Sequence, residues 1–136
     1  MSNECPGTMK FEIRDETDIG YAALGAKKYA EKIGFNMSSQ YMISTAVSEL
    51  ARNIFVYAKK GVIIMSMLEE NLMKGIKVVA DDAGPGIENI DRALEDEFST
   101  GGTMGIGLPG TKRLMDDFKI ESCIGKGTTV VIKKWV

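Results

Sequence analysis

Glycine is distributed unevenly along this chain of 136 residues. Nine of its 15 glycines lie between positions 84 and 127, whereas the first 60 residues contain only four. Glycine destabilises the interior of helices and strands and favours turns and loops. We therefore expect residues 98–107, which are too rich in glycine for regular structure, to form a loop, and the longer regular elements to precede the glycine-rich region.

Hydrophobic alternation predicts five strands. Apolar and polar residues alternate over residues 9–14, and residues 61–69 and 72–80 are rich in Val, Ile and Met, which is typical of strands. Residues 118–123 and 128–135 flank a glycine-rich turn and are expected to form a terminal hairpin. Strands that pair as hairpins predict a sheet made mainly of antiparallel neighbours.

Capping residues and helical periodicity predict four helices between these strands. They are expected from an N-cap at Thr17 or Asp18 to Gly34, from an N-cap at Ser38 or Ser39 to residue 58, over residues 88–97 and over residues 108–117. Helices interspersed with hairpins favour a two-layer α/β (α+β) sandwich, in which a mixed, mostly antiparallel sheet carries helices on one face. The length is that of one domain, so we expect residues 1–136 to form a single domain with residues 1–8 as a flexible N-terminus.

The composition excludes several classes of function. The charge is −2, from 17 Lys+Arg and 19 Asp+Glu, and no basic tract is present, which argues against nucleic acid as a partner. The chain has no histidine, so a Ser-His-Asp triad or an imidazole metal site is excluded. Two cysteines, no apolar leader and no apolar stretch near 20 residues indicate a reduced cytoplasmic protein without a membrane span.

Glu49 and Asn53 form the first candidate site, on the second predicted helix. They are four residues apart and therefore lie one turn above each other. Both fall at the edge of the apolar sector of this helix, which contains Ile43, Val47, Leu50 and Ile54. A carboxylate there could accept a proton from a hydroxyl, and an amide oxygen suits Mg²⁺. The alternative is a partly exposed helix edge, with Glu49 paired to Arg52 or to solvent.

The second candidate is Asp82, which follows an apolar strand and precedes Gly84 and Gly86. A carboxylate at a strand end can accept a hydrogen bond from the amino group of a base. The glycines let the backbone approach a flat ligand and adopt positive φ. An ordinary Pro-Gly turn over residues 81–86 is the alternative.

The third candidate is the glycine-rich run over residues 101–110, which leads into a helix. Backbone amides freed by glycines at a helix N-terminus suit phosphate groups. The run does not fit the dinucleotide fingerprint, because a loop and not a strand precedes Gly105, nor a P-loop, because Thr111 and Lys112 stand in reversed order. A mobile surface loop is the alternative interpretation. A fourth candidate, Thr128 after Gly125 and Gly127, is also explained by a tight hairpin turn.

The order of these motifs is more specific than any one of them. A helix with Glu-x-x-x-Asn, a strand with Asp-x-Gly-x-Gly, a glycine-rich loop and Gly-x-Gly-Thr resembles the N, G1, G2 and G3 boxes of the GHKL superfamily, the ATP-binding (Bergerat) fold of gyrase, histidine kinases and MutL. The match covers residues 9–136. Within this superfamily, the segments 48–53, 98–100, 107–110 and 112–116 resemble the RsbT-type switch kinases of bacterial stressosomes, which are related to the anti-sigma-factor kinases.

This resemblance implies an ATP-dependent serine/threonine protein kinase with Mg²⁺. It implies that Glu49 is catalytic, accepting the proton of the incoming hydroxyl, and that Asn53 binds the metal. By the same resemblance, Asp82 binds the adenine amino group and Thr128 supports the base. The remaining nucleotide-binding residues that it implies are Gly84 and Gly86 in the base pocket, and Gly102, Gly105, Gly107 and Leu108 near the phosphates.

The resemblance also implies partners. Family members phosphorylate STAS-domain scaffold proteins and then activate a downstream protein, often a PP2C-type phosphatase. One alternative is a nucleotide-gated interaction module, of the anti-sigma or phosphatase-activator type, with little catalysis; another is a simple ATPase. The acceptor residue, the upstream signal and the choice between monomer and dimer stay open.

Overall fold

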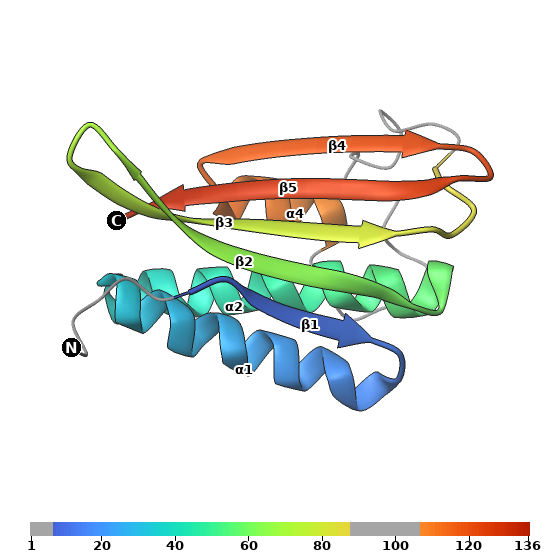
Figure 1. Cartoon of the computed structure of the whole chain (residues 1–136), viewed down its shortest axis with the longest axis horizontal. Helices are drawn as coiled ribbons and strands as arrows, with labels where there is room; N and C mark the ends of the chain where they lie inside the picture. The colour runs from blue at the N-terminus through green and yellow to red at the C-terminus, as the bar shows by residue number, and fades with distance from the viewer. Residues whose placement is uncertain (1–6, 88–106) are drawn as a thin grey trace.

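A sheet and a layer of helices form the two layers of the protein (Figure 1). The computed structural model describes residues 7–87 and 107–136. In these residues the strands form a five-stranded sheet with the order β1-β2-β3-β5-β4, and every neighbouring pair is antiparallel. The strands are β1 (Met9–Ile13), β2 (Gly61–Glu70), β3 (Met73–Asp82), β4 (Asp117–Cys123) and β5 (Gly127–Trp135).

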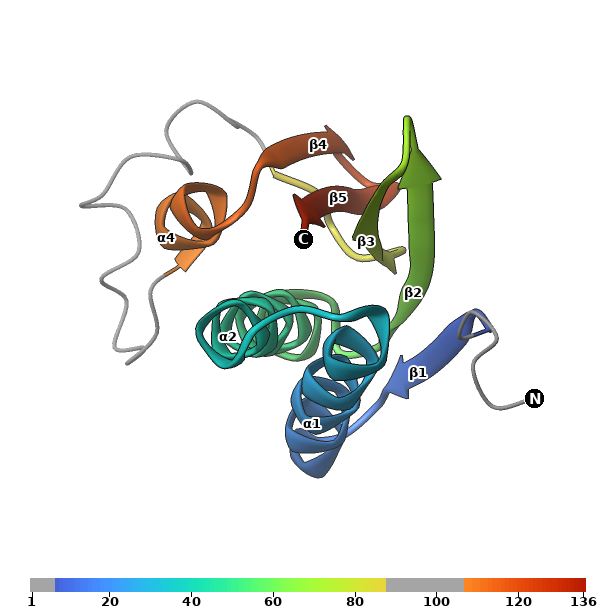
Figure 2. The same ribbon diagram turned by 90° about the vertical axis from the view of Figure 1, so that its left-hand side faces the viewer.

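The helices cover one face of this sheet, as Figure 2 shows end-on. They are α1 (Glu16–Ile33), α2 (Met37–Asn53), a π-helical turn η1 (Ile54–Ala58) and α4 (Gly107–Leu114). The core lies between the layers, and the predicted apolar sector of α2 is confirmed because Ile43, Val47, Leu50 and Ile54 are all buried. In the described ranges no helix is both long and apolar enough to cross a membrane. The expected α/β two-layer sandwich is confirmed.

The starts of the two long helices differ from expectation. Asp15, not Thr17 or Asp18, is the N-cap of α1; its side chain accepts from the Thr17 amide at 3.0 Å, while Asp18 accepts from the Asp15 amide at 3.1 Å. This reciprocal pair is a capping box, in which Asp18 has the supporting role inside the first turn. In α2 the cap is Asn36, which accepts from the Ser39 amide at 2.8 Å. In both cases the capping acceptor precedes the position expected.

The other boundaries differ by a few residues. β3 continues through Asp82, so Asp81 and Asp82 belong to a strand and not to the expected turn. Gly34 ends α1 with a φ of 117°, as expected of a glycine C-cap. The helix expected over residues 88–97 lies outside the described residues.

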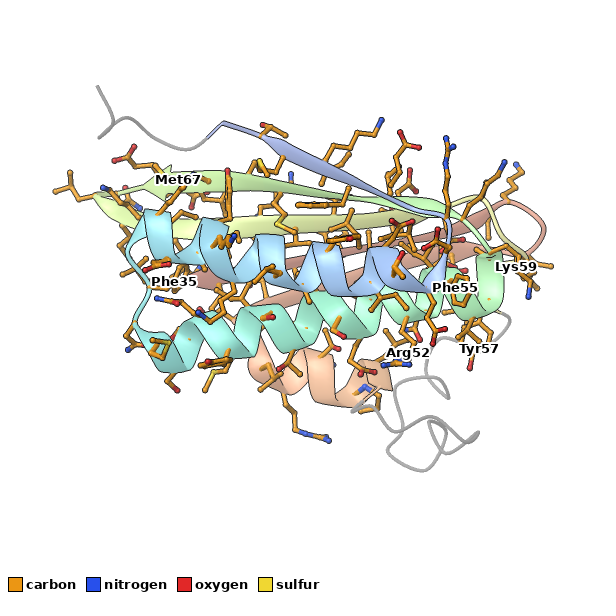
Figure 3. All side chains as sticks on the ribbon, turned by 90° about the horizontal axis from the view of Figure 1, so that it is seen from below. Phe35, Arg52, Phe55, Tyr57, Lys59 and Met67 are labelled. Atoms are coloured by element: carbon orange, nitrogen blue, oxygen red, sulfur yellow. The ribbon has the colours of Figure 1, made fainter. Side chains whose placement is uncertain are left out.

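The end of α2 is not regular α-helix. Residues 54–58, expected to continue it, form the wider π turn η1, which stops at Lys59 with a φ of 74°. Figure 3 shows Phe55, Tyr57 and Lys59 around this end, opposite Phe35 and Met67. π turns insert one residue into a helix and often occur at functional sites. Here the turn follows Asn53 directly, at the end of the molecule where β3 also ends (Figure 1).

Candidate active site

The core-facing side of three strands changes from apolar to polar at one row. Asp82 pairs with Thr128, and Thr128 pairs with Ser122, so these residues stand side by side on β3, β5 and β4. We call these three residues the polar row. In the neighbouring row on the same face, two positions before Asp82 and Ser122 and two after Thr128, the side chains are the apolar Ala80, Ile120 and Val130. Since side chains alternate between faces along a strand, the polar row continues the core surface toward the end of the sheet.

Asp82 has one carboxylate oxygen engaged and one available. Its Oδ1 accepts from the Gly84 amide at 2.9 Å, and Oδ2 has no hydrogen-bond partner among the residues that the structure describes. The neighbouring Asp81 faces the opposite side of the sheet, where it accepts from the Thr129 hydroxyl at 2.7 Å. Of the two adjacent aspartates, therefore, only Asp82 belongs to the polar row.

Gly84 and Gly86 are required by close packing of this chain on itself. A Cβ at Gly84 would lie 2.6 Å from Cβ of Ala58 in η1. Gly86 has a φ of 83°, and a Cβ there would collide with the carbonyl oxygen of Cys123. The loop after β3 is thus held between the end of α2 and the β4–β5 hairpin, which fixes the surroundings of Asp82.

Ser122 belongs to this site and was missed by sequence reasoning. Its Oγ lies 2.8 Å from Oγ1 of Thr128, accepts from the Ile87 amide at 2.6 Å, and lies 3.2 Å from the carbonyl oxygen of Gly127. The available signal was its place as the third core-facing position of β4, after two apolar ones. Its neighbours, however, depend on strand register, which the alternation alone does not provide.

Glu49 is buried in α2 with 6% of its surface exposed. Its Oε1 accepts from the amide of Gly107, the first residue of α4, at 3.1 Å. The buried Thr111 hydroxyl donates to the Gly107 carbonyl at 3.0 Å. The alternative pairing with Arg52 is not found, since Arg14–Glu12 is the ion pair seen within residues 7–87 and 107–136. Glu49 thus contacts the start of the helix that follows the glycine-rich run.

Asn53, the last residue of α2, lies one turn after Glu49 and is half-buried. Its side-chain amide has no hydrogen-bond partner in the described part of the chain, so it can accept a ligand. Among the described residues, no group of three or more acidic or cysteine side chains is placed to hold a metal ion. A cation near Asn53 would therefore have few protein ligands, which suits Mg²⁺ because it keeps most of its waters.

The remaining predicted residues divide into two groups. Gly107 begins α4 with a φ of 68°, and Leu108 packs into the core with 8% of its surface exposed. The Leu108 side chain therefore stabilises α4 against the rest of the fold. Gly102 and Gly105, with most of the glycine-rich run, lie outside the described residues.

The described residues form two hollows, of which one contains the polar row. One of about 310 Å³ is lined by Asp81, Asp82, Glu121, Ser122, Cys123, Lys126, Gly127, Thr128 and Thr129. Residues from both faces of the sheet line this hollow. The core-facing site is therefore defined by the polar row and not by the hollow. A second, of about 670 Å³, lies between α2 and α4 and is lined by Ser38, Tyr41, Met42, Thr45, Gly110, Arg113 and Leu114. Glu49 is not among the residues that line this second hollow; Thr45, one helical turn before it, is the nearest of them along α2.

Comparison with known proteins identifies the family of this chain. Residues 7–134 match the family model of the histidine kinase-like ATPase domain. The chain is 46% identical to the serine/threonine-protein kinase RsbT of Bacillus subtilis, over 91% of this chain and 93% of that protein. It is 29% identical to the anti-sigma F factor of Clostridium acetobutylicum, over 93% of this chain and 90% of that protein.

A solved structure supports the fold. The mycobacterial sensor histidine kinase MprB superimposes with a TM-score of 0.56 at 15% identity, covering 93% of this chain and 96% of that one. The expected GHKL fold, ATP use and serine/threonine kinase class are confirmed by these similarities. The chain belongs to the histidine kinase-like ATPase domain family and, within it, to the serine/threonine kinases of the RsbT type.

Proposed function

We propose that this kinase transfers the γ-phosphoryl group of ATP to a serine or threonine of a STAS-domain scaffold protein. The observation that carries the proposal is a set of acceptor atoms left available at one end of the molecule. These are the amide of Asn53 and the second carboxylate oxygens of Glu49 and Asp82, which have no partner in the described part of the chain. Buried or half-buried polar groups are normally hydrogen-bonded, so such atoms favour a bound ligand.

At the base end, Asp82 Oδ2 accepts a hydrogen bond from the adenine amino group. Thr128, its neighbour in the polar row, supports the base through its hydroxyl. Gly84 and Gly86 hold the loop beside Asp82 close to η1 and to the hairpin, so the carboxylate is oriented before the nucleotide binds. A charged acceptor oriented in this way contributes about 1.5–3 kcal/mol to binding.

At the phosphate end, Asn53 offers its amide oxygen to Mg²⁺, which neutralises phosphate charge when it is bound. Glu49 accepts the hydroxyl proton through Oε2, because Oε1 is held by the Gly107 amide. The acceptor oxygen bonds to the γ-phosphorus while the bond to the β,γ-bridging oxygen breaks, and ADP leaves. Phosphoryl transfer needs mainly positioning and charge neutralisation, so this sparse set of side chains is chemically sufficient. We assign binding of the phosphates to the main chain of four residues, Gly102, Gly105, Gly107 and Leu108.

The proposed partners rest on the similarity to RsbT. A STAS-domain protein is the substrate, and a downstream protein such as a PP2C-type phosphatase receives the signal, with residues 1–136 acting as one domain in the cytoplasm. The similarity to an anti-sigma F factor favours a second candidate, in which nucleotide gates binding to a partner and transfer is secondary.

The two candidates are separated by one experiment. The wild type, Glu49→Gln and Asn53→Ala are incubated with γ-labelled ATP, Mg²⁺ and a STAS-domain protein, and label in that protein is measured beside complex formation. For the kinase we expect transfer in the wild type and a loss of about 100-fold or more in Glu49→Gln. Complex formation without transfer in the wild type would contradict the kinase and favour the interaction module.

A further inference from the structure

The guanidinium of Arg52, in the last turn of α2, has no anion beside it among the described residues. The side chain is half-buried, and its Nε atom is enclosed by protein without a hydrogen-bond partner. The ion pair found in the described ranges joins Arg14 and Glu12, so Arg52 forms none there. A charged group taken partly out of water without a partner costs free energy. Such a group therefore favours a bound anion.

Arg52 lies on the side of α2 that faces α4. It follows Glu49 by three residues and Thr45 by seven, so the three side chains share one face of the helix. On this face Glu49 accepts from the Gly107 amide of α4, and Thr45 lines the hollow between the two helices. Figure 3 shows Arg52 on the α4 side of α2, near the end of that helix. Arg52 is thus placed beside Glu49 and directly before Asn53, at the phosphate end of the candidate site.

Arg52 and Glu49 do not neutralise each other, although residues three apart on a helix can form an ion pair. The Oε1 atom of Glu49 accepts from the Gly107 amide instead, and no ion pair joins the two side chains. A paired arginine would lower the proton affinity of the carboxylate and use up its own charge there. Because the two are unpaired, Glu49 can take up the proton of a hydroxyl and Arg52 can bind an anion.

The anion that the proposed reaction brings to this end is the γ-phosphoryl group of ATP. Negative charge spreads over the equatorial oxygens of that group during transfer. α2 carries two charged side chains, Glu49 and Arg52, and the glutamate alone would oppose this charge. A guanidinium offers a rigid, planar set of N–H donors that matches phosphate oxygens, and it stays charged at physiological pH. Arg52 therefore has the charge, the shape and the position that suit the transferred group.

We propose that Arg52 is a catalytic residue that binds the γ-phosphoryl group of ATP during transfer. Its guanidinium donates to the non-bridging oxygens while the bond from the acceptor oxygen forms and the bond to the β,γ-bridging oxygen breaks. Arg52 neither gains nor loses a proton; the hydroxyl proton goes to Glu49 and ADP leaves, as in the proposed function. This inference rests on that function and adds the side chain that stabilises the charge of the group in transfer.

The test compares the wild type with Arg52→Gln, which removes the charge and keeps a polar side chain. Single-turnover transfer from γ-labelled ATP is measured with Mg²⁺ at saturating ATP and a saturating STAS-domain protein. We expect transfer by Arg52→Gln to be about 10- to 100-fold slower, as the loss of a charged hydrogen bond in the transition state predicts. Affinity for ADP, which lacks the γ-phosphoryl group, should stay within about twofold of the wild type by calorimetry.

Chemical rescue separates a missing guanidinium from a damaged fold. Arg52→Ala leaves space for a free guanidinium ion, so millimolar guanidinium should restore part of its transfer, whereas tetramethylammonium, which has no N–H donor, should not. Arg52→Lys keeps the charge without the planar donors, and its rate should lie between those of the wild type and Arg52→Gln. It also replaces the two shorter variants if they do not fold. The control is Arg14→Gln, in the exposed ion pair with Glu12, which should transfer as the wild type does.

Three contrary results are distinguishable. A wild type without affinity for ATP would overturn both the proposed function and this inference. If Arg52→Gln loses ADP affinity and thermal stability together, and guanidinium does not rescue Arg52→Ala, Arg52 is structural. If Arg52→Gln transfers normally at saturating STAS-domain protein but has a raised KM for it, Arg52 binds an acidic group of that protein and not the γ-phosphoryl group. The last two results would overturn only the role of Arg52.

Discussion

The two ends of the candidate site are built differently. At the base end, Asp82, Thr128 and Ser122 stand in register on three strands, and hydrogen bonds link them to the neighbouring loop. At the phosphate end, in the described part of the chain, the Glu49 side chain has one hydrogen bond, from the Gly107 amide, and the side-chain amide of Asn53 has none.

This difference fits the roles proposed for the two ends, selective binding at one and phosphoryl transfer at the other. A hydrogen-bonded row on strands is oriented before a ligand arrives, which favours selective binding at little entropic cost. Polar groups with few partners among the described residues, as at Glu49 and Asn53, suit a ligand that would complete their hydrogen bonds and react there, as we propose. Substitutions at the base end should therefore change affinity and selectivity, and those at the phosphate end should change the rate.

The largest effect is expected at Glu49. Glu49→Gln keeps the size and the acceptor for the Gly107 amide but cannot take up a proton. Phosphoryl transfer should fall by about 100-fold or more, while ATP affinity stays within about twofold, since one hydrogen bond at most is altered. Single-turnover transfer and calorimetry measure the two quantities. Glu70→Gln, at the exposed end of β2, is the control. If Glu49→Gln lowered ATP affinity and the transfer rate by the same factor, the two ends would not differ in role.

The next effect is expected at Asp82. Asp82→Asn replaces a charged acceptor by a neutral one, so ATP affinity should fall by about 10- to 100-fold. The thermal midpoint should change little, because the amide oxygen of asparagine can still accept from Gly84. Calorimetry and thermal melting measure the two quantities. Affinity and stability falling together would mean that Asp82 is structural.

A smaller effect is expected where the two ends touch. Gly84→Ala places a Cβ 2.6 Å from Cβ of Ala58, so the loop or η1 must shift, and the free energy of unfolding should fall by about 1–3 kcal/mol. The control is Gly20→Ala in α1, where a Cβ meets nothing within 4 Å, and which should raise stability by about 0.5–1 kcal/mol. Urea denaturation measures both. Equal stability of the two variants would show that the contact with η1 carries no constraint.

The smallest effect lies outside both ends. The Thr17 hydroxyl, with the amides of Thr17 and Asp18, lowers the pKa of Asp15 from its ordinary value of 3.8. A lowered pKa stabilises the fold above 3.8, and this contribution is lost as the pH falls through the folded-state pKa. Asp15→Asn keeps a capping oxygen without titrating, so its thermal midpoint should decrease less than that of the wild type on acidification. The wild type and Asp15→Asn should bind nucleotide with the same affinity at neutral pH. A difference in affinity would show that the N-cap of α1 influences the candidate site.

Local pattern accounts for what the sequence predicted. The apolar sector of α2, the strand alternation and Gly34 as a C-cap depend on residues within one or two turns of each other, so their positions followed from spacing. The order of the motifs predicted Asp82 and Thr128 as site residues. The structure adds that they are directly paired across β3 and β5. The caps at Asp15 and Asn36 were placed too late because several nearby side chains can cap a helix, and packing selects among them.

For the described residues, the sequence by itself determined where most of the helices and strands lie and which face of each is apolar, because those properties repeat with a fixed period along the chain. Only the tertiary structure decided that Ser122 lies beside Thr128 and Ile87, that Glu49 meets Gly107, and that Ala58 meets Gly84. The alternation of a strand gives the face of a side chain but not its neighbour. That neighbour is fixed by sheet register and by contacts between residues far apart in the chain.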